Sequence, residues 1–366
     1  SKEAIIVELV ERYHDDLDAV AEETLTAVGG DERPVADQVV ALGSKIAACA
    51  VRHRAALLLT VYDPPSGASD QLVRVSQRSP LAVEQALLET LRAGEASGEI
   101  RRGIDVETLA DRMCQVLLHV SLGVFRDGRG AEEVPAIRCR TLLRGVVVDP
   151  PSDADLDRSE PFEAAARTVH QWSKGDDDED DRLPQLRAVA RREFGRRGYE
   201  ATTVRDIAKA AGMSVGSVYR LIGSKDELLG SIMRSFEVRA RTGWRGVLRS
   251  EGSVVEKLDA LMWININAVD RFSDEYNIQI AWIRESPPND ANLGSSFSAR
   301  LSDLKAVLAR GIRSGELQVE GPSADIRAWS LFELLWMPEN IVQQLGPRGA
   351  LTLARETTLR GAAPRP

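Results

Sequence analysis

Residues 203–221 read TVRDIAKAAGMSVGSVYRL, and this stretch decides the fold expected for the middle of the chain. Apolar residues recur at helical spacing on both sides of Gly212, a residue that can adopt the positive φ of a tight turn. Thr203 and Ser214 stand where each short helix would begin, and both are suitable N-caps. The spacing predicts a helix-turn-helix, a motif that places its second helix in the major groove of DNA.

The apolar positions of this stretch are explained by packing. Ile207 and Ala211 are expected on the inner face of the first helix. Val215, Val218 and Leu221 are expected to form the buried stripe of the second helix. The remaining outward residues are small, hydroxylic or basic, which suits an approach to a phosphate-lined groove. They are Arg205, Gly216, Ser217, Tyr219 and Arg220.

The charge of the chain is unevenly distributed. The net charge of −9 over 366 residues argues against nucleic-acid binding only if it is spread evenly. Residues 182–225 carry ten Lys and Arg against three acids, a local charge of +7, whereas residues 149–181 carry twelve acids against three bases, a local charge of −9. Screening limits exposed charges to roughly 8–10 Å at physiological salt, so the local patch governs phosphate binding. We expect a basic module beside an acidic, solvated linker that ends in the acidic run 176–181.

An internal repeat indicates the architecture of the rest of the chain, where apolar residues also follow helical spacing. Residues 1–6, SKEAII, resemble residues 224–229, SKDELL; residues 98–100, GEI, resemble residues 315–317, GEL. Two matches in the same order predict two diverged copies of one helical domain in an all-α protein. The expected organisation is a first copy over 1–148, an acidic linker with one short helix over 149–182, a helix-turn-helix domain over 183–230 and a second copy over 231–361.

Further residues around the motif extend its pattern. Phe194 and Gly198-Tyr199 precede it, and residues 224–228, SKDEL, follow it. Over nearly fifty residues, from about Leu183 to Leu229, the segment resembles the DNA-binding domain of TetR-type transcriptional regulators. It departs from that family at Ile222, where an aromatic residue is usual. The resemblance implies a transcriptional regulator that binds double-stranded DNA, a repressor released from its operator by a small effector.

The resemblance also implies roles for individual residues. By position, Thr203, Tyr219 and Lys225 look like phosphate contacts. Arg205 is the expected base reader, because an arginine can bond O6 and N7 of guanine together. The complete set expected to face DNA is Thr203, Arg205, Ser214, Val215, Gly216, Ser217, Tyr219, Arg220 and Lys225.

Regulatory domains of this family usually hold a small molecule between their helices. The aromatic residues of the second copy suit an apolar ligand such as a lipid, an acyl-CoA or a sterol, although plain core or dimer packing explains each of them as well. The candidates are Trp263, Asn267, Tyr276, Trp282, Trp329, Phe332 and Trp336. Weaker candidates in the first copy are His53, Tyr62, Cys114 and His119.

The repeat and the resemblance together suggest a double regulator. Residues 1–148 look like a first regulatory domain whose own DNA-binding domain is absent from this sequence, and residues 231–361 look like the second. Double TetR-type regulators include a mycobacterial repressor of a mammalian-cell-entry lipid-import operon. The two copies are expected to pair through terminal helices, so that one chain imitates the usual homodimer; a homodimer of two chains is the alternative. The pairing segments are 106–125 with 137–148 and 324–344 with 351–359.

Other classes find little support. The one GxSxG match, GMSVG at residues 212–216, falls inside the helix-turn-helix and does not follow a strand, and the sequence contains no phosphate loop or HExxH, so no enzyme is expected. Its three cysteines are isolated and its four histidines do not fall at metal spacing, so no disulfide scaffold, metal or cofactor is expected. No stretch approaches 18 apolar residues and no secretory signal opens the chain, so no membrane segment is expected and the cytosol is the simplest compartment. The remaining alternative is a ligand sensor or dimerisation protein whose helix-turn-helix no longer binds DNA.

Overall fold

The regular structure of the protein is helical. The computed structural model describes residues 2–28, 30–59, 64, 68–118, 133–173, 182–285 and 294–365. Among these residues the one β feature is an isolated bridge between Val147 and Leu317. The all-α class expected from the periodicity is therefore confirmed. The acidic run 176–181 lies outside the described residues.

The helices form two bundles, a linker and a small three-helix module. The N-terminal bundle contains α1 (Lys2–Ala27), α2 (Val35–Arg52), α3 (Arg54–Leu59), α4 (Asp70–Ser76), α5 (Leu81–Ser97), α6 (Val106–Leu118) and α8 (Glu133–Arg144). The linker contains α9 (Asp153–Asp157) and α10 (Glu160–Ser173), and the module contains α11 (Arg182–Arg197), α12 (Val204–Ala210) and α13 (Val215–Ile222). The C-terminal bundle contains α14 (Lys225–Arg249), α15 (Val254–Arg271), α16 (Ser273–Glu285), α17 (Gly294–Ser314), α18 (Ala324–Leu334), α19 (Glu339–Ala354) and the π-helical turn η1 (Arg355–Leu359).

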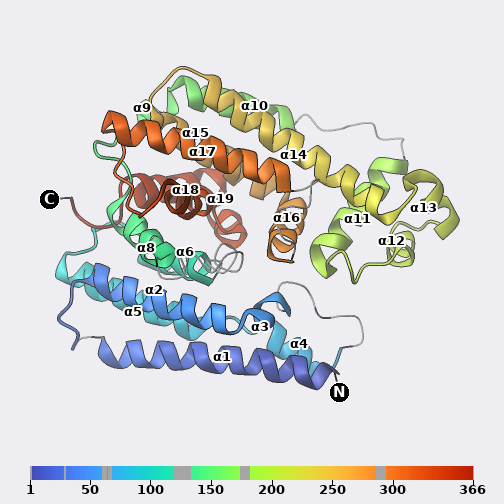
Figure 1. Ribbon diagram of the computed structural model, residues 1–366, viewed down its shortest axis with the longest axis horizontal. Coiled ribbons are helices and arrows are strands. Elements are labelled where there is room, and N and C mark those ends of the chain that lie inside the picture. Colours follow the sequence, from blue (N-terminus) through green and yellow to red (C-terminus); the bar gives the residue numbers. More distant parts are fainter. Residues whose placement is uncertain are drawn as a thin grey trace.

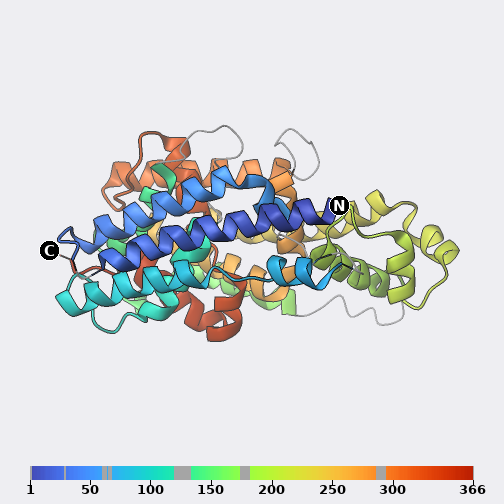
Figure 2. The same cartoon turned by 90° about the horizontal axis from the view of Figure 1, so that it is seen from below.

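The two bundles lie side by side along the length of the molecule. Figure 1 shows α1, α2 and α5 on one side, α10, α14, α15 and α17 on the other, and α6, α8, α18 and α19 between them. The module of α11 to α13 projects at one end, as Figure 2 also shows. Both α1 and α14 begin at that end, so the first helix of each bundle starts on the same side of the molecule.

In the N-terminal bundle, a tight contact joins the end of α5 to the start of α2. Gly94 lacks a side chain where a Cβ would come within 2.9 Å of both Val35 and Ile100. The amide of Ile100 donates to the carbonyl of Gly94 at 3.0 Å. The carboxylate of Glu99 accepts a hydrogen bond from the amide of Val35, the first residue of α2, at 2.9 Å. The glutamate therefore caps α2 from a neighbouring turn.

The C-terminal bundle repeats this contact. A Cβ on Gly311 of α17 would come within 2.8 Å of Val254 and 2.6 Å of Leu317. The amide of Leu317 donates to the carbonyl of Gly311 at 3.0 Å, and Glu316 accepts from the amide of Val254, the first residue of α15, at 2.8 Å. The sequence match between GEI (98–100) and GEL (315–317) thus reflects the same structural arrangement in both bundles, in which the glutamate caps the N-terminus of a neighbouring helix.

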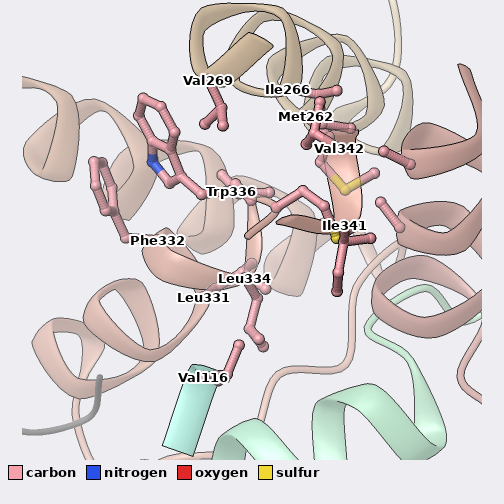
Figure 3. Packing of buried hydrophobic residues seen from close by; sticks show 14 of the residues in the cluster. Val116, Met262, Ile266, Val269, Leu331, Phe332, Leu334, Trp336, Ile341 and Val342 are labelled. Atoms are coloured by element: carbon pink, nitrogen blue, oxygen red, sulfur yellow. The ribbon is translucent and has the colours of Figure 1, made fainter. Parts of the chain in front are cut away.

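The hydrophobic core continues between the two bundles. Figure 3 shows Val116 of α6 beside Leu334 of α18, within a cluster of buried side chains that also contains Trp336. All three side chains are buried. Burial of apolar surface on both sides of the boundary favours the paired arrangement of the bundles.

Two fully buried arginines cross the same boundary. Arg112 of α6 donates to the carbonyl of Leu334 at 3.0 Å and to the hydroxyl of Thr358 at 2.9 Å. Arg138 of α8 forms an ion pair with Glu333 of α18 at 2.7 Å. Burying a guanidinium without partners costs folding free energy, and these contacts supply partners from the other bundle. They therefore favour one fixed position of the two bundles relative to each other. Residues 119–125 of the expected pairing segment lie outside the described residues.

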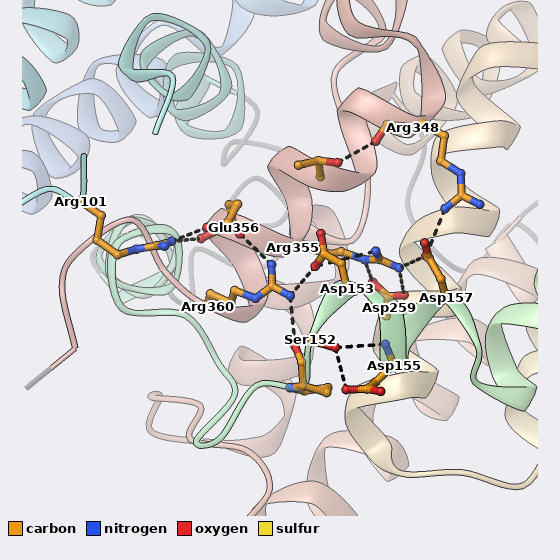
Figure 4. A network of polar contacts seen from close by, with 12 residues as sticks. Arg101, Ser152, Asp153, Asp155, Asp157, Asp259, Arg348, Arg355, Glu356 and Arg360 are labelled. Atoms are coloured by element: carbon orange, nitrogen blue, oxygen red, sulfur yellow. Dashed lines mark hydrogen bonds and ion pairs between the residues drawn. The ribbon is translucent and has the colours of Figure 1, made fainter. Parts of the chain in front are cut away.

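The linker is fastened to the C-terminal bundle by a polar network (Figure 4). Arg355 of η1 bonds both carboxylate oxygens of Asp259 at 2.8 Å and reaches Asp157 of α9 at 2.7 Å. Burial raises the pKa of Asp259, and Arg355 opposes that shift. The network extends to the N-terminal bundle, because Arg101 bonds Glu356 at 2.7 Å.

The linker holds more helix than expected. The anticipated helix is α10, capped by Ser159, whose hydroxyl accepts from the amide of Phe162 at 3.3 Å. Phe162 and Val169 are buried, as the helical spacing indicates. The short helix α9 precedes it, capped by Ser152.

Candidate DNA-binding surface and effector site

The two helices of the helix-turn-helix begin at hydroxyl caps. Thr203 accepts from the amide of Asp206 at 3.2 Å, and Asp206 accepts from the amide of Thr203 at 2.9 Å, which makes a capping box. These bonds lower the pKa of Asp206. Ser214 accepts from the amide of Ser217 at 3.1 Å, and Gly212 between the helices has φ of 64°. The expected caps and turn are confirmed.

The buried stripe of α13 differs from the prediction. Val218 and Ile222 are buried, whereas Val215 and Leu221 are 36% and 37% exposed. The prediction was wrong for these two residues. The buried face of α13 runs through Val218 and Ile222, so Leu221 lies at the side of that face and Val215 lies in the first turn of the helix, where it stays exposed. Ile222 packs inward in place of the usual aromatic residue. In α12, Ile207 is buried as expected, while Ala211 is half-buried at the helix end.

The side chains expected to meet DNA are mostly exposed. Arg205 is exposed, and among the described residues no hydrogen-bond or ion-pair partner holds it. Tyr219 is 49% exposed. A Cβ on Gly216 would meet nothing within 4 Å, so this residue lies at an open surface. Arg220 is exposed and reaches the hydroxyl of Ser217 at 3.2 Å. The exposed residues thus lie on α12 and along α13.

Lys225 has a structural role that the sequence reasoning missed. Its ammonium group donates to the carbonyls of Tyr199 at 2.7 Å and Thr202 at 3.0 Å, and lies 3.9 Å from the centroid of the Tyr199 ring. Two of its three N–H groups therefore tie the start of α14 to the loop before α12. The third N–H group remains available for the expected phosphate contact.

The structure brings together only part of the expected effector set. Tyr276 and Trp336 stack with ring centroids 4.9 Å apart. Phe332 packs on the ring of Trp244 at 5.8 Å. Trp329 is half-buried on α18.

Two other effector-site candidates, Trp263 and Asn267, make contacts away from the Tyr276–Trp336 stack. Trp263 packs against Phe162 of the linker helix at 5.7 Å and lies 4.8 Å from the guanidinium of Arg348. The side-chain amide of Asn267 donates to the carbonyl of Trp263, one helical turn back, at 2.8 Å. These contacts place Trp263 against the linker and occupy Asn267 within its own helix.

The remaining candidates add little. Tyr62, His119 and the side chain of Trp282 lie outside the described residues. Cys114 is buried, and burial raises the pKa of its thiol.

A buried arginine beside the Tyr276–Trp336 stack was not foreseen from the sequence. Arg300 of α17 is 2% exposed, and its guanidinium lies 6.0 Å from the ring of Trp336. Its Nη2 reaches Gln279 at 3.5 Å, a long hydrogen bond, while Nε and Nη1 have no hydrogen-bond partner among the described residues. Burial lowers the pKa of Arg300 to about 10. An unpaired buried polar group costs about 1–3 kcal/mol, so this guanidinium is a candidate ligand anchor.

Glu237 of α14 is the acidic counterpart of this site. It is 9% exposed, and its Oε1 has no hydrogen-bond partner among the described residues. Burial raises the pKa of Glu237 to about 6, and the charge of Arg300 opposes the shift. The two groups attract each other, but no ion pair between them occurs in the described part of the chain. The site therefore combines the stacked rings of Tyr276 and Trp336, the guanidinium of Arg300 and a carboxyl group, Glu237, whose pKa is raised.

Comparison with known proteins places this geometry in a family. Residues 186–232 match the family model described as bacterial regulatory proteins, tetR family. The HTH-type transcriptional repressor KstR2 of Rhodococcus jostii is 36% identical over 139 residues, which cover 37% of this chain and 68% of the repressor. The chain belongs to the TetR family. This is a family of transcriptional regulators.

Other similarities of this TetR-family chain cover less. The KstR2 repressor of Mycobacterium tuberculosis is 34% identical over 89 residues, 24% of this chain, and the chain spans 44% of that repressor's length. The solved structure of the ketosteroid transcriptional regulator KstR2 of M. tuberculosis aligns with 48% of this chain and 90% of its own at 24% identity, with a TM-score of 0.39. In the described residues of the TetR-family chain, no helix has the length and apolar character needed to span a bilayer.

Proposed function

We propose that this protein is a DNA-binding transcriptional repressor that a small apolar effector releases from its operator. The observation that carries the proposal is the helix-turn-helix, where the exposed end of α13 presents Gly216, Tyr219 and Arg220, and Arg205 is exposed on α12. Polar and basic groups on such a face contact phosphates and base edges. The local charge of +7 over residues 182–225 supplies the attraction to the DNA backbone.

A salt series tests the DNA-binding part. Gel shift of the full chain with a mixed-sequence duplex should show binding whose affinity falls steeply as salt rises, because phosphate contacts release counterions. The alternative function, a sensor that no longer binds DNA, predicts no salt-dependent shift. A regulator of this kind acts in the cytoplasm, and no catalytic step is needed for it.

The proposed effector is an apolar molecule with an anionic group, of the acyl-CoA or lipid-acid class. The stack of Tyr276 on Trp336 offers an aromatic wall. The Nε and Nη1 atoms of Arg300, which have no partner among the described residues, offer charge-assisted hydrogen bonds. A neutral sterol would leave Arg300 without a partner. Release of DNA by oleoyl-CoA, but not by cholesterol, in the same gel shift is the expected result; release by cholesterol alone would contradict the anionic class.

We further propose that the chain is a double TetR-type regulator whose bundles pair as an internal pseudodimer. The repeated glutamate cap at Val35 and Val254 supports two copies of one unit. The buried contacts of Arg112 and Arg138 join helices that were expected to pair. A lipid-class effector also suits the resemblance to double regulators of lipid import. Light scattering separates the arrangements, because an internal pair predicts the 40.1 kDa of one chain and a homodimer of two chains predicts twice that mass.

A further inference from the structure

Three potential metal ligands meet between α1 and α2 of the N-terminal bundle. Cys49 lies in the last turn of α2, His53 is the C-cap residue that follows the helix, and Asp16 faces them from α1. The His53 Nε2 and Asp16 Oδ2 atoms are 2.8 Å apart. The candidate ligand atoms of all three residues lie within 4.8 Å of one another.

The chemistry of this set suits a borderline transition metal. Residues four apart on a helix share a face, the spacing by which a helix supplies two ligands to zinc. A thiolate, an imidazole and a carboxylate are the ligand types that Zn²⁺ prefers, and three protein ligands leave one position of a tetrahedron open. Mg²⁺ and Ca²⁺ prefer oxygen ligands, so the sulfur of Cys49 disfavours them.

The C-terminal bundle shows that the fold does not require these residues. The sequence repeat aligns Asp16 with Arg239, and the shared caps align Cys49 with Ala268 and His53 with Phe272. There the Arg239 guanidinium lies 5.2 Å from the ring of Phe272.

The backbone at the matched positions is the same. The amide of His53 donates to the carbonyl of Cys49 at 3.0 Å, and the amide of Phe272 donates to the carbonyl of Ala268 at 2.9 Å. An aromatic neighbour is also shared, because Tyr13 lies 5.9 Å from His53 as Phe236 lies 6.1 Å from Phe272. Packing of the first two helices therefore works without any metal-binding side chain, which sets the Asp, Cys and His group apart from ordinary core.

We propose that Asp16, Cys49 and His53 form a binding site for a divalent transition-metal ion of the zinc class, which fastens α1 to α2. This site is separate from the effector site proposed in the C-terminal bundle. Cys49 is buried, while Asp16 is partly exposed, so an ion enters from the side of the carboxylate. Because α1 begins at the end that carries the helix-turn-helix module, the ion would stabilise a helix that starts on that side of the molecule.

One cation competes for the same carboxylate. Arg52 lies 3.0 Å from the Oδ2 of Asp16. Its side chain is 68% exposed, so it can turn into solvent at little cost when a metal arrives. Removal of this arginine should therefore tighten metal binding.

Cobalt titration of the chelator-treated full chain tests the proposal. One equivalent of Co²⁺ should bind, with thiolate-to-cobalt charge-transfer absorption, and Zn²⁺ should displace it. Cys49→Ala should abolish the charge-transfer band, and His53→Phe should weaken binding about tenfold or more. Both variants install the residue found at the matched position of the C-terminal bundle, so they should keep the helical circular dichroism of the wild type.

Two matched variants complete the test. Cys114→Ala removes another buried cysteine and should leave the charge-transfer band unchanged. Arg52→Ala should bind Co²⁺ more tightly than the wild type. Absence of the band in the wild-type chain, its persistence in a folded Cys49→Ala variant, or weaker binding by Arg52→Ala would each overturn the proposal.

Discussion

Replacement of Arg300 by methionine should stabilise the protein and blunt its response to effector. The Nε and Nη1 atoms of the buried guanidinium have no hydrogen-bond partner in the described part of the chain, and each unpaired group costs about 1–3 kcal/mol. Methionine keeps most of the apolar stem and removes these groups. Part of the gain is offset, because Glu237 loses the cation that favours its charged form. We therefore expect a net rise of about 1–3 kcal/mol in the free energy of unfolding.

The same substitution at a paired arginine supplies the control. Arg355 is 3% exposed, almost as buried as Arg300, but it bonds both oxygens of the buried Asp259. Arg355→Met should lower the free energy of unfolding by about 3–5 kcal/mol, because it leaves a buried carboxylate without its partner. Urea unfolding followed by circular dichroism measures both variants.

Release of DNA by the effector tests whether Arg300 binds the effector, independently of its effect on stability. Hydrogen bonds to a charged group contribute about 1.5–3 kcal/mol, so Arg300→Met should raise the oleoyl-CoA concentration needed for DNA release by about 10- to 100-fold. Binding to DNA without effector should be unchanged. A loss of stability in Arg300→Met similar to that of Arg355→Met would refute the reasoning, since it would mean that the guanidinium is well paired in the folded protein.

Four further changes have defined outcomes. Arg205→Ala should cost about 1–3 kcal/mol of operator binding and relax preference at one base pair, as measured by competition among operator variants. Lys225→Ala should weaken binding to all sequences, reduce the salt slope by about one and also lower the melting temperature, because its bonds to two backbone carbonyls are lost. Thr203→Ala should lose about 1 kcal/mol of stability with the capping box, as seen in urea unfolding. The folded-state pKa of Glu237 is raised from 4.5 to about 6, so its protonated form favours folding at low pH and this advantage disappears as pH rises through about 6. Glu237→Gln should therefore be more stable than wild type by about 2 kcal/mol near neutral pH, and the difference should vanish below about pH 4.5.

Helix caps and the tight turn could be predicted from the sequence, because only a few residue types suit those backbone positions. Thr203 and Ser214 cap their helices, and Gly212 adopts positive φ, because few other residues satisfy those backbone positions. The buried stripe of α13 was partly wrong because helical spacing alone does not say which neighbours cover the ends of a short helix. Val215 lies at such an end and stays exposed.

Tertiary features could not be read from the sequence in the same way. Arg300 is one of three arginines in α17, and nothing in its sequence neighbours distinguishes it from an exposed arginine. The Asp16, Cys49 and His53 group needs a contact between two helices, and Cys49 and His53 alone form too short a pattern to indicate a metal site. Trp263 and Trp336 were both candidates for the effector site, but Trp263 packs against the linker helix and Trp336 against Tyr276, because aromatic residues of one bundle point to different sides of their helices.

Selection of bound duplexes from a random library tests the central claim, that the helix-turn-helix reads an operator, most directly. The wild-type chain should enrich one sequence motif, and the Arg205→Ala and Tyr219→Ala variants should lose that enrichment while keeping the wild-type helical circular dichroism. Equal recovery of all sequences by the wild-type chain, or the same motif enriched by both variants, would contradict the account.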